Sequence, residues 1–229
     1  MPLHKSQVRG DDLLFRLLQG DVGRGELENN LLREFQKDYP LSKLRLLLNS
    51  TDDRMVAAGI WIASELGAKA RPLFADIVRL IRHRLKQVRF FALDCIATCA
   101  TPQDGNVISL CLDGLEDTEP AVIWKTMTFI VNASPLLLRA AMAREITSEA
   151  GLVSTRAQGL ALALDPSNPH NVAKIISFLG GTDALLRRYA AAAAVRVAQH
   201  DPRPLKNALI SEDPIIRRFA TDMAVRADM

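Results

Sequence analysis

The side chains best suited to binding chemistry are aromatic, basic and acidic residues that recur at two fixed positions of a repeated segment. Trp and Arg are the residues most often found at the energetic centres of protein interfaces. We therefore predict that this set contacts a partner: Trp61, Phe90, Asp94, Trp124, Arg188, Arg218 and Asp222. A structural alternative stays open for Trp61 and Trp124, because a large ring could instead be wedged between neighbouring repeats.

A second candidate is a basic block that contains five cations and no acid: Arg79, Arg82, Arg84, Lys86 and Arg89. Residues 54–104 carry eight basic and four acidic side chains, whereas the whole chain has a net charge of only +3. Such a block could attract an acidic partner, either a protein or a nucleic acid. The alternative is a solvated helix end, where cations are favoured near the C-terminus.

Catalytic and metal-binding motifs are not recognisable in this chain. It has no Gly-rich phosphate loop, no G-x-S-x-G elbow and no H-E-x-x-H segment. Cys95 and Cys99 occupy positions where another repeat has apolar residues, so we predict that they are small core residues, and Cys111 has no recognisable base near it. The histidines are scattered along the chain at His4, His83, His170 and His200. We therefore expect a protein with no enzymatic activity, no cofactor and no metal.

An internal repeat of about 32 residues positions the candidate binding residues. The order aliphatic, Arg, any residue, aromatic, Ala occurs at Val88–Ala92, Leu186–Ala190 and Ile216–Ala220. With three weaker copies, the repeats start near residues 55, 88, 122, 153, 186 and 216, and the third start could be one residue later. Apolar residues fall at offsets 0, 3, 4, 7 and 11 from each start, which is one face of a helix. Offsets 2 and 6, which hold the candidate residues, should point away from that face.

Each of these amphipathic segments follows a leucine-rich segment and a short polar turn. The turns contain acids that can cap the following helix, such as Asp183 and Asp213. The composition is 48% hydrophobic but only 5% aromatic, which favours helices over sheets. We therefore predict an all-α protein in which residues 1–39 form an N-terminal helical cap and residues 40–229 form a solenoid of about six helix–turn–helix repeats.

This pattern resembles HEAT repeats, in which an acid in the turn precedes Val-Arg and a small residue. Asp183 before Leu186-Arg187 and Asp213 before Ile216-Arg217 match best, and Val88-Arg89 matches without a turn acid. The resemblance implies a right-handed α-solenoid whose second helices line a concave, partner-binding face. It also implies a structural role for the arginine at offset 1, which in the family pairs with a turn acid.

The segment Ala57–Gly67 (AAGIWIASELG) resembles a helix of small bacterial HEAT-repeat proteins, several of which are immunity proteins. This resemblance implies a non-enzymatic scaffold that neutralises a cognate toxin domain. We expect an acidic patch of that partner to face the basic block. Because the chain has no signal peptide and no apolar run long enough to span a membrane, we expect it to be cytoplasmic.

An enzymatic alternative rests on similarity to alkylpurine DNA glycosylases, whose HEAT-like solenoid carries an Asp, tryptophans and basic residues. Phe90 and Asp94 lie one turn apart on a predicted helix, between the helices that bear Trp61 and Trp124. In this alternative the chain is a DNA repair enzyme, Asp94 is its catalytic acid, and the basic block contacts phosphates. A net charge of +3 is low for a DNA-binding protein.

Overall fold

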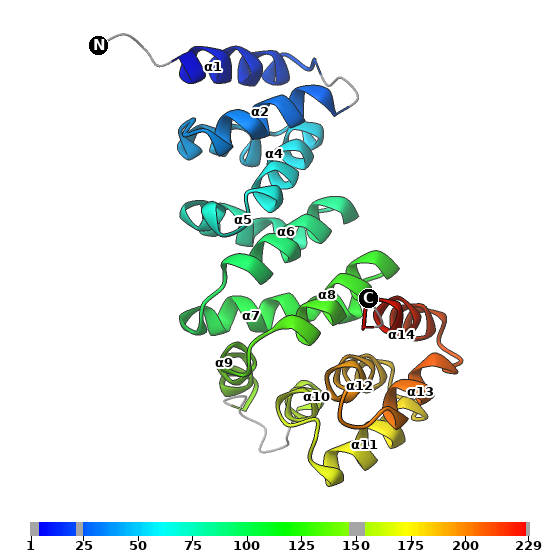
Figure 1. The fold of residues 1–229 in the computed structure, drawn as a ribbon. Helices are drawn as coiled ribbons and strands as arrows, with labels where there is room; N and C mark the ends of the chain where they lie inside the picture. Colours follow the sequence, from blue (N-terminus) through cyan, green and yellow to red (C-terminus); the bar gives the residue numbers. More distant parts are fainter. Residues whose placement is uncertain (1–4, 22–24, 147–153, 228–229) are drawn as a thin grey trace. The chain divides into compact units, whose positions relative to one another are not determined.

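The computed structural model describes residues 5–21, 25–146 and 154–227, and every regular element in these ranges is a helix. The prediction of an all-α helical repeat protein is confirmed (Figure 1). The chain forms two compact units, residues 1–99 and residues 100–229, and each is described by itself. The predicted boundary between a cap and the repeats, after residue 39, stays a prediction.

Unit 1 is a stack of helix pairs in which the second helix of each pair packs against the second helix of the next (Figure 1). Short 3-10 segments break up the first helices of the second and third pairs; η2 contains Pro72, which lacks the N–H that a regular α-helix needs. The pairs are α1 (Lys5–Leu18) with α2 (Glu26–Gln36), then η1 (Leu41–Leu44) and α3 (Arg45–Leu48) with α4 (Asp53–Glu65), then η2 (Gly67–Leu73), α5 (Phe74–Val78) and η3 (Arg79–Arg82) with α6 (Lys86–Cys99).

Side-chain caps set the starts of several second helices. Asp52 accepts a hydrogen bond from the Arg54 N–H at the start of α4. In the same way, Asp183 accepts hydrogen bonds from the N–H groups of Leu185 and Leu186. These helices begin about two residues before the predicted starts, because the repeat pattern marks the first buried residue and not the cap.

Unit 2 contains the remaining pairs, preceded by the short segment η4 (Pro102–Asp104). The start predicted at residue 153 lies outside the described residues. The pairs are α7 (Gly105–Cys111) and η5 (Leu112–Glu116) with α8 (Pro120–Asn132), α9 (Pro135–Ile146) with α10 (Thr155–Leu164), α11 (Pro169–Leu179) with α12 (Ala184–Val197), and α13 (Arg203–Leu209) with α14 (Pro214–Ala227).

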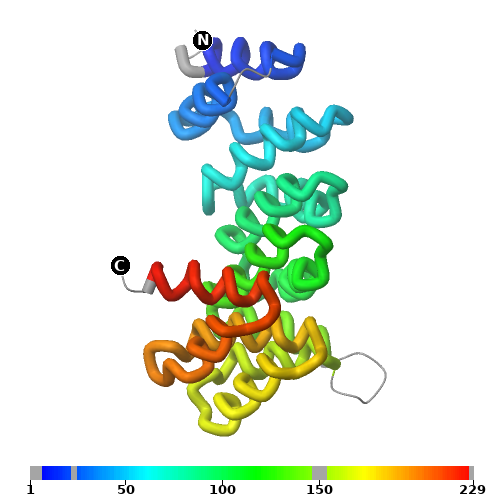
Figure 2. Tube along the Cα trace, turned by 90° about the vertical axis from the view of Figure 1, so that its right-hand side faces the viewer, coloured from blue at the N-terminus to red at the C-terminus, as the bar shows by residue number. Residues whose placement is uncertain are grey.

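Helix α12 is the central element of unit 2. It carries five consecutive alanines, Ala190–Ala194, and none of them has exposed surface. It packs against α8, α10, α11, α13 and α14 (Figure 1). In a simple solenoid each repeat contacts only its neighbours, but α12 reaches α8, two repeats earlier. Figure 2 shows the same doubling back for α14 (red), which also lies against α8 (green).

Two arginines on one face of α12 hold it to the ends of earlier helices. Arg196 donates to the carbonyl oxygens of Ile130, Val131 and Ala133 over 2.8–2.9 Å. These carbonyls lie at the C-terminal end of α8, where no intrahelical N–H is available to them. Arg188, two turns earlier, donates to the Leu115 carbonyl of η5. Both guanidinium groups therefore satisfy helix ends within the unit.

This packing corrects the predicted orientation of offsets 2 and 6 in unit 2. Thr128, Gly159 and Ala192 were expected to point away from the core, but all three are buried. A Cβ atom on Gly159 would lie 2.2 Å from the Tyr189 ring of α12. The prediction is wrong here because the second helices of unit 2 pack on one another and cover this face: α12 contacts α8, α10 and α14.

The carbonyl contacts of Arg196 predict a stability effect. Replacing Arg196 with Met leaves three helix-end carbonyls without their donor, so we expect unfolding free energy to fall by about 2 kcal/mol. Urea unfolding followed by circular dichroism measures the change. The matched control is Arg203→Met, because the Arg203 guanidinium pairs only with Asp201 at an exposed site. Equal midpoints for both variants would show that the capping contacts are not stabilising.

The close approach of α3 to α4 predicts that glycine is more stabilising than alanine at position 59, although alanine is usually the better helix former. Alanine is normally better than glycine inside a helix by about 1 kcal/mol. A Cβ atom on Gly59 would, however, lie 2.8 Å from Leu47 Cβ and 3.1 Å from the Leu48 nitrogen. We expect Gly59→Ala to lower the melting temperature, since overpacking costs about 1–3 kcal/mol. Gly180→Ala is the control, because its Cβ would meet only Ser177 O at 3.8 Å.

Candidate partner-binding groove

A groove of about 330 Å³ lies across the second helices of unit 1. Its lining combines aromatic rings, small residues, amides and two charged side chains. The residues are Gly25, Glu28 and Asn29 at the start of α2, Arg54, Ala57, Ala58 and Trp61 from α4, and Gln87 and Phe91 from α6. Two of its three helices, α4 and α6, are second helices that the repeat pattern assigned to partner binding, and α2 belongs to the predicted cap.

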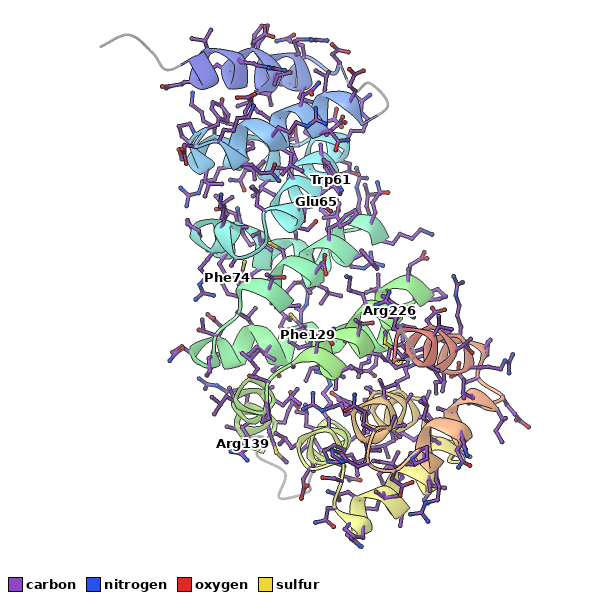
Figure 3. The ribbon with its side chains drawn as sticks, in the orientation of Figure 1. Trp61, Glu65, Phe74, Phe129, Arg139 and Arg226 are labelled. Atoms are coloured by element: carbon purple, nitrogen blue, oxygen red, sulfur yellow. The ribbon has the colours of Figure 1, made fainter. Side chains whose placement is uncertain are left out.

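Trp61 is the predicted binding residue that lines the groove. Its side chain is half-buried, so part of the indole ring stays accessible. Trp61 and Glu65 are neighbours on α4, and in Figure 3 both lie on the side of unit 1 opposite Phe74. The Trp61 backbone is held by the hydroxyl of Ser64, which donates to its carbonyl oxygen at 2.8 Å.

Helix α6 supplies a pair of aromatic rings beside Trp61. Phe91 lines the groove, and Phe90 meets it edge to face with 5.5 Å between ring centroids. Asp94 follows Phe90 by one helical turn. Sequence reasoning missed Phe91 as a site residue, because offset 3 was assigned to the core, whereas its side chain is only half-buried.

The groove also contains a carboxylate oxygen without a hydrogen-bond partner. Glu28 is half-buried, and its Oε2 atom is shielded from solvent and has no partner among the described residues. Arg54, at the same groove, does not neutralise it through any hydrogen bond or ion pair in the described structure. Its Nε and Nη2 atoms instead bond to the Asp52 carboxylate at 3.2 and 2.7 Å. These bonds lower the pKa of Asp52.

The groove residues at the start of α2 were not predicted from the sequence, for a different reason. The cap carries no copy of the repeat, so no register pointed to Glu28 or Asn29. The available signal was a pair of acids, Glu26 and Glu28, which is favourable in the first turn of a helix.

The predicted basic block is partly neutralised by acids of the same unit. Arg79 lies 2.8 Å from Asp76, and Arg84 lies 2.6 Å from Asp53, the first residue of α4. His83 Nε2 is 3.5 Å from the same Asp53 carboxylate. These pairs reduce the charge available to nucleic acid, on which the DNA-repair alternative depends.

The other members of the block differ in their contacts. Arg89 donates to the carbonyl oxygens of His83 and Arg84. Arg82 and Lys86 are exposed, and each also takes part in contacts within the chain. Whether the block binds an acidic partner stays a prediction.

The structural role expected for the offset-1 arginines is confirmed. Arg89, Arg187 and Arg217 each reach back to the turn before their own helix. Arg187 donates to the carbonyls of Gly181 and Thr182 at 2.8 and 3.1 Å, and Arg217 donates to that of Ser211 at 2.6 Å. A second contact places Arg187 3.8 Å from Asp213, the turn acid of the next repeat.

The four remaining candidate residues belong to unit 2 and have different environments. Trp124 meets Phe219 at 6.3 Å between ring centroids, and the Arg226 guanidinium lies 5.3 Å from the centre of the Trp124 ring. With Arg188 bonded to η5, two of the four have clear contacts within the chain. Arg218 is exposed on α14, and Asp222 is half-buried there. Partner binding by these residues is untested.

A larger cavity of about 750 Å³ opens between the turns of the last two repeats of unit 2. Ile210, which is 79% exposed, lies at it, together with Ile176 and Ile215. The Arg187–Asp213 pair forms part of its wall. It contains no aromatic side chain and none of the predicted binding residues, so the groove of unit 1 is the stronger candidate site.

Cys95 and Cys99 lie in the core, as predicted, and Cys111 is buried as well. Cys95 and Cys99 are buried, and their thiols face the carbonyl oxygens of Ala63 and Gly67 at 3.6 and 3.4 Å. Burial raises the pKa of Cys111, which opposes thiolate formation. Within the ranges that the structure describes, no three His, Cys, Asp or Glu side chains are grouped to hold a metal ion.

Over residues 5–21, 25–146 and 154–227, no single helix has both the length and the hydropathy to cross a bilayer. Helices α8 and α9 meet these criteria only as a pair, and the pair is bent by 115°.

One solved structure with a similar fold is a designed repeat protein. No protein-family model and no curated protein matches the chain. A designed armadillo repeat protein in complex with the peptide (KR)4 is similar over 98% of this chain and 99% of that chain, with a TM-score of 0.50 and 14% identity. This similarity shows a helical repeat fold and nothing finer.

Two engineered proteins are less similar. One has a TM-score of 0.43 and 17% identity over 81% of this chain and 95% of that chain. The other has a TM-score of 0.47 and 14% identity over 96% of this chain and 68% of that chain.

The acid beside the basic block predicts a pH dependence. Burial alone would raise the pKa of Asp76, but hydrogen bonds from Arg45 and Asn49 and the charge of Arg79 bring it below its ordinary value of 3.8. Its stabilising effect is therefore present above pH 3.8 and is lost as the pH falls through the folded-state pKa. We expect Asp76→Asn to flatten the decline of stability below about pH 4, measured by urea unfolding.

A second variant tests the cause of that dependence. Arg45→Met removes a hydrogen bond to Asp76 that spans 3.0 Å. It should raise the pKa of Asp76 toward its ordinary value and so make the decline of stability below about pH 4 smaller than in the wild type. An unchanged profile in both variants would show that Asp76 does not contribute to acid sensitivity.

Proposed function

We propose that this protein is a non-enzymatic scaffold that binds another protein through the groove of unit 1. The observation that carries the proposal is the half-buried Trp61 ring in a groove formed by α2, α4 and α6. Partly buried tryptophans in such settings are common binding hot spots, because the ring offers a large apolar surface at low entropic cost.

The walls of the groove suit a protein surface or an extended segment. Trp61 and Phe91 provide apolar contact, while Asn29 and Gln87 can both donate and accept hydrogen bonds. All residues that line the groove except Gly25 lie on helices, which hold their side chains in place with little reorganisation on binding. A volume of about 330 Å³ accommodates one or two side chains of a partner and leaves the rest of the contact to the surrounding surface.

The fold supports a binding role in general terms. The solved structure of the designed armadillo repeat protein, which has a similar fold, contains that protein in complex with a peptide. We therefore propose peptide or protein recognition for this chain also, with Trp61, Phe90 and Asp94 at the contact.

We further propose that the partner is a toxin domain and that binding neutralises it by covering its surface. This finer proposal rests on the resemblance of Ala57–Gly67 to a helix of bacterial immunity proteins. That segment contributes Ala57, Ala58 and Trp61 to the groove, so the resemblance and the groove concern the same residues. A toxin neutralised in this way would lose activity in proportion to the fraction of its molecules that are bound at the groove.

A photo-cross-linker at the groove identifies the partner. Gln87 is exposed and lines the groove, so a benzophenone side chain at this position would react with whatever occupies it. A variant with the same group at Gln36, which is exposed near the end of α2, reports background. The cross-linking is carried out in cells of the source organism. The cross-linked partner is then identified by mass spectrometry and purified.

With the purified partner, Trp61→Ala should weaken binding by about 100-fold, the loss expected for a hot-spot residue. The melting temperature should change little, because the ring is only half-buried. Isothermal titration calorimetry gives the affinity, and Phe15→Ala is the control, since Phe15 is 61% exposed on α1. Wild-type affinity in Trp61→Ala would remove the groove as the binding site. A partner without toxic activity would end the immunity proposal alone.

A further inference from the structure

We infer that the groove recognises a basic segment of its partner and receives a lysine or arginine side chain, with Glu28 as the counter-ion. The inference rests on the proposed function and specifies the chemistry of the partner at the same groove. Two features of unit 1 support it: an unpaired carboxylate oxygen and aromatic walls.

The unpaired oxygen indicates a missing hydrogen-bond donor. Glu28 Oε2 has no accessible surface that water could use and no hydrogen-bond partner among the described residues. A buried acceptor in this state is unfavourable, and a donor in the groove would relieve it after a rotation of the half-buried Glu28 side chain that exposes the oxygen to the groove. Hydrogen bonds between a cation and a carboxylate are roughly twice as strong as those between neutral groups, so a cationic donor gains most.

The aromatic walls favour the same ligand. A guanidinium or ammonium group is attracted to the face of a Trp or Phe ring. Trp61 and Phe91 line the groove together with Glu28, so a long side chain could lay its methylene groups on the rings and direct its charge to the carboxylate. Elsewhere in this unit, Arg71 makes such a contact and lies 4.1 Å from the centre of the Phe74 ring.

The groove already has one cation, but its charge is directed elsewhere. Arg54 forms a two-atom contact with the Asp52 carboxylate, and it is the one basic residue among the groove residues. Two further acids lie on the same helices, Glu65 one turn beyond Trp61 and Asp94 one turn beyond Phe90. Asp94 also takes part in a contact within the chain, so the charge complementarity of the groove rests on Glu28, the one acid that lines it.

This result reverses the sign of charge that the sequence predicted for the partner. The basic block suggested an acidic patch, but Arg79 and Arg84 are paired with Asp76 and Asp53. The carboxylate of Glu28, in contrast, has an oxygen with no hydrogen-bond partner in the described structure. A ligand gains more from an unsatisfied group than from a paired one.

A fluorescence titration tests the inference directly. The chain contains two tryptophans, so Trp124→Phe makes Trp61 the sole reporter. The substitution costs no hydrogen bond that the described structure contains, because Trp124 Nε1 has no partner there. The probes are octapeptides of alternating arginine and leucine, of lysine and leucine, and of citrulline and leucine. Citrulline keeps the shape of arginine without its charge.

We expect the arginine or the lysine peptide to change the Trp61 emission with a saturable curve, and the citrulline peptide to bind at least tenfold more weakly. The comparison between arginine and lysine decides which head group the groove prefers. Equal affinity for the arginine and citrulline peptides would overturn the inference without any change to the protein. The absence of a saturable signal from either cationic peptide would overturn it as well.

Glu28→Gln identifies the counter-ion. This variant keeps the size of the side chain and removes its charge, and we expect about a tenfold loss of affinity for the better cationic peptide. The matched control is Glu26→Gln, an exposed acid in the same turn of α2 that does not line the groove. Equal losses in the two variants would show that only the general field of α2 contributes and would overturn the role of Glu28.

The native partner separates this inference from the proposed function. If its binding depends on Trp61 but not on Glu28, the groove is the site and the cation is wrong. If its binding depends on neither residue, both proposals fail. A dependence on both, together with a loss when the basic residues of the bound segment are replaced, supports both.

Discussion

The close packing around the alanine run of α12 is the constraint on which unit 2 depends. Five side chains of one carbon each let α8, α10, α11, α13 and α14 approach a single helix. Such an approach brings helix ends into the interior, where their carbonyl groups need donors. Arg188 and Arg196, two turns apart on α12, provide those donors to η5 and α8. Without the two arginines, the close packing that the alanines allow would leave the carbonyl groups at these helix ends without hydrogen-bond donors.

The two units use their second helices differently. In unit 2 these helices fold onto one another, and Trp124 is packed against Phe219 of α14. In unit 1 the corresponding helices α2, α4 and α6 form a row, and a groove stays open along it. Residues at the same offset of the repeat thus have different environments: at offset 6, Ala192 is buried in α12, whereas Trp61 lines the candidate binding site. One repeat pattern can therefore serve stability in one unit and binding in the other.

Electrostatic contacts link successive repeats and also decide which charges a partner can use. Asp53 is the first residue of α4 and pairs with Arg84 in the turn before α6, and Asp213 approaches Arg187 from the next repeat. A carboxylate placed one repeat away from its cation neutralises it without being near it in the sequence. The basic block is therefore less cationic in the fold than in the chain. The carboxylate of Glu28 is in the opposite situation, because no described cation satisfies its buried oxygen.

The features that depend on local geometry could be predicted from the amino-acid sequence alone. Periodicity and capping residues predicted the helices and their turns, the arginines at offset 1 and the burial of Cys95 and Cys99, because each depends on contacts within a repeat or on a period of 3.6 residues. The tertiary structure was needed to show where offsets 2 and 6 point, which cations are paired and that Glu28 lines the same groove as Trp61 and Phe91. A helical period identifies the apolar face of one helix, but it does not identify which other helices pack against that helix. Packing between helices that are distant in the sequence decides whether a face is covered, as in α12, or open, as in α4.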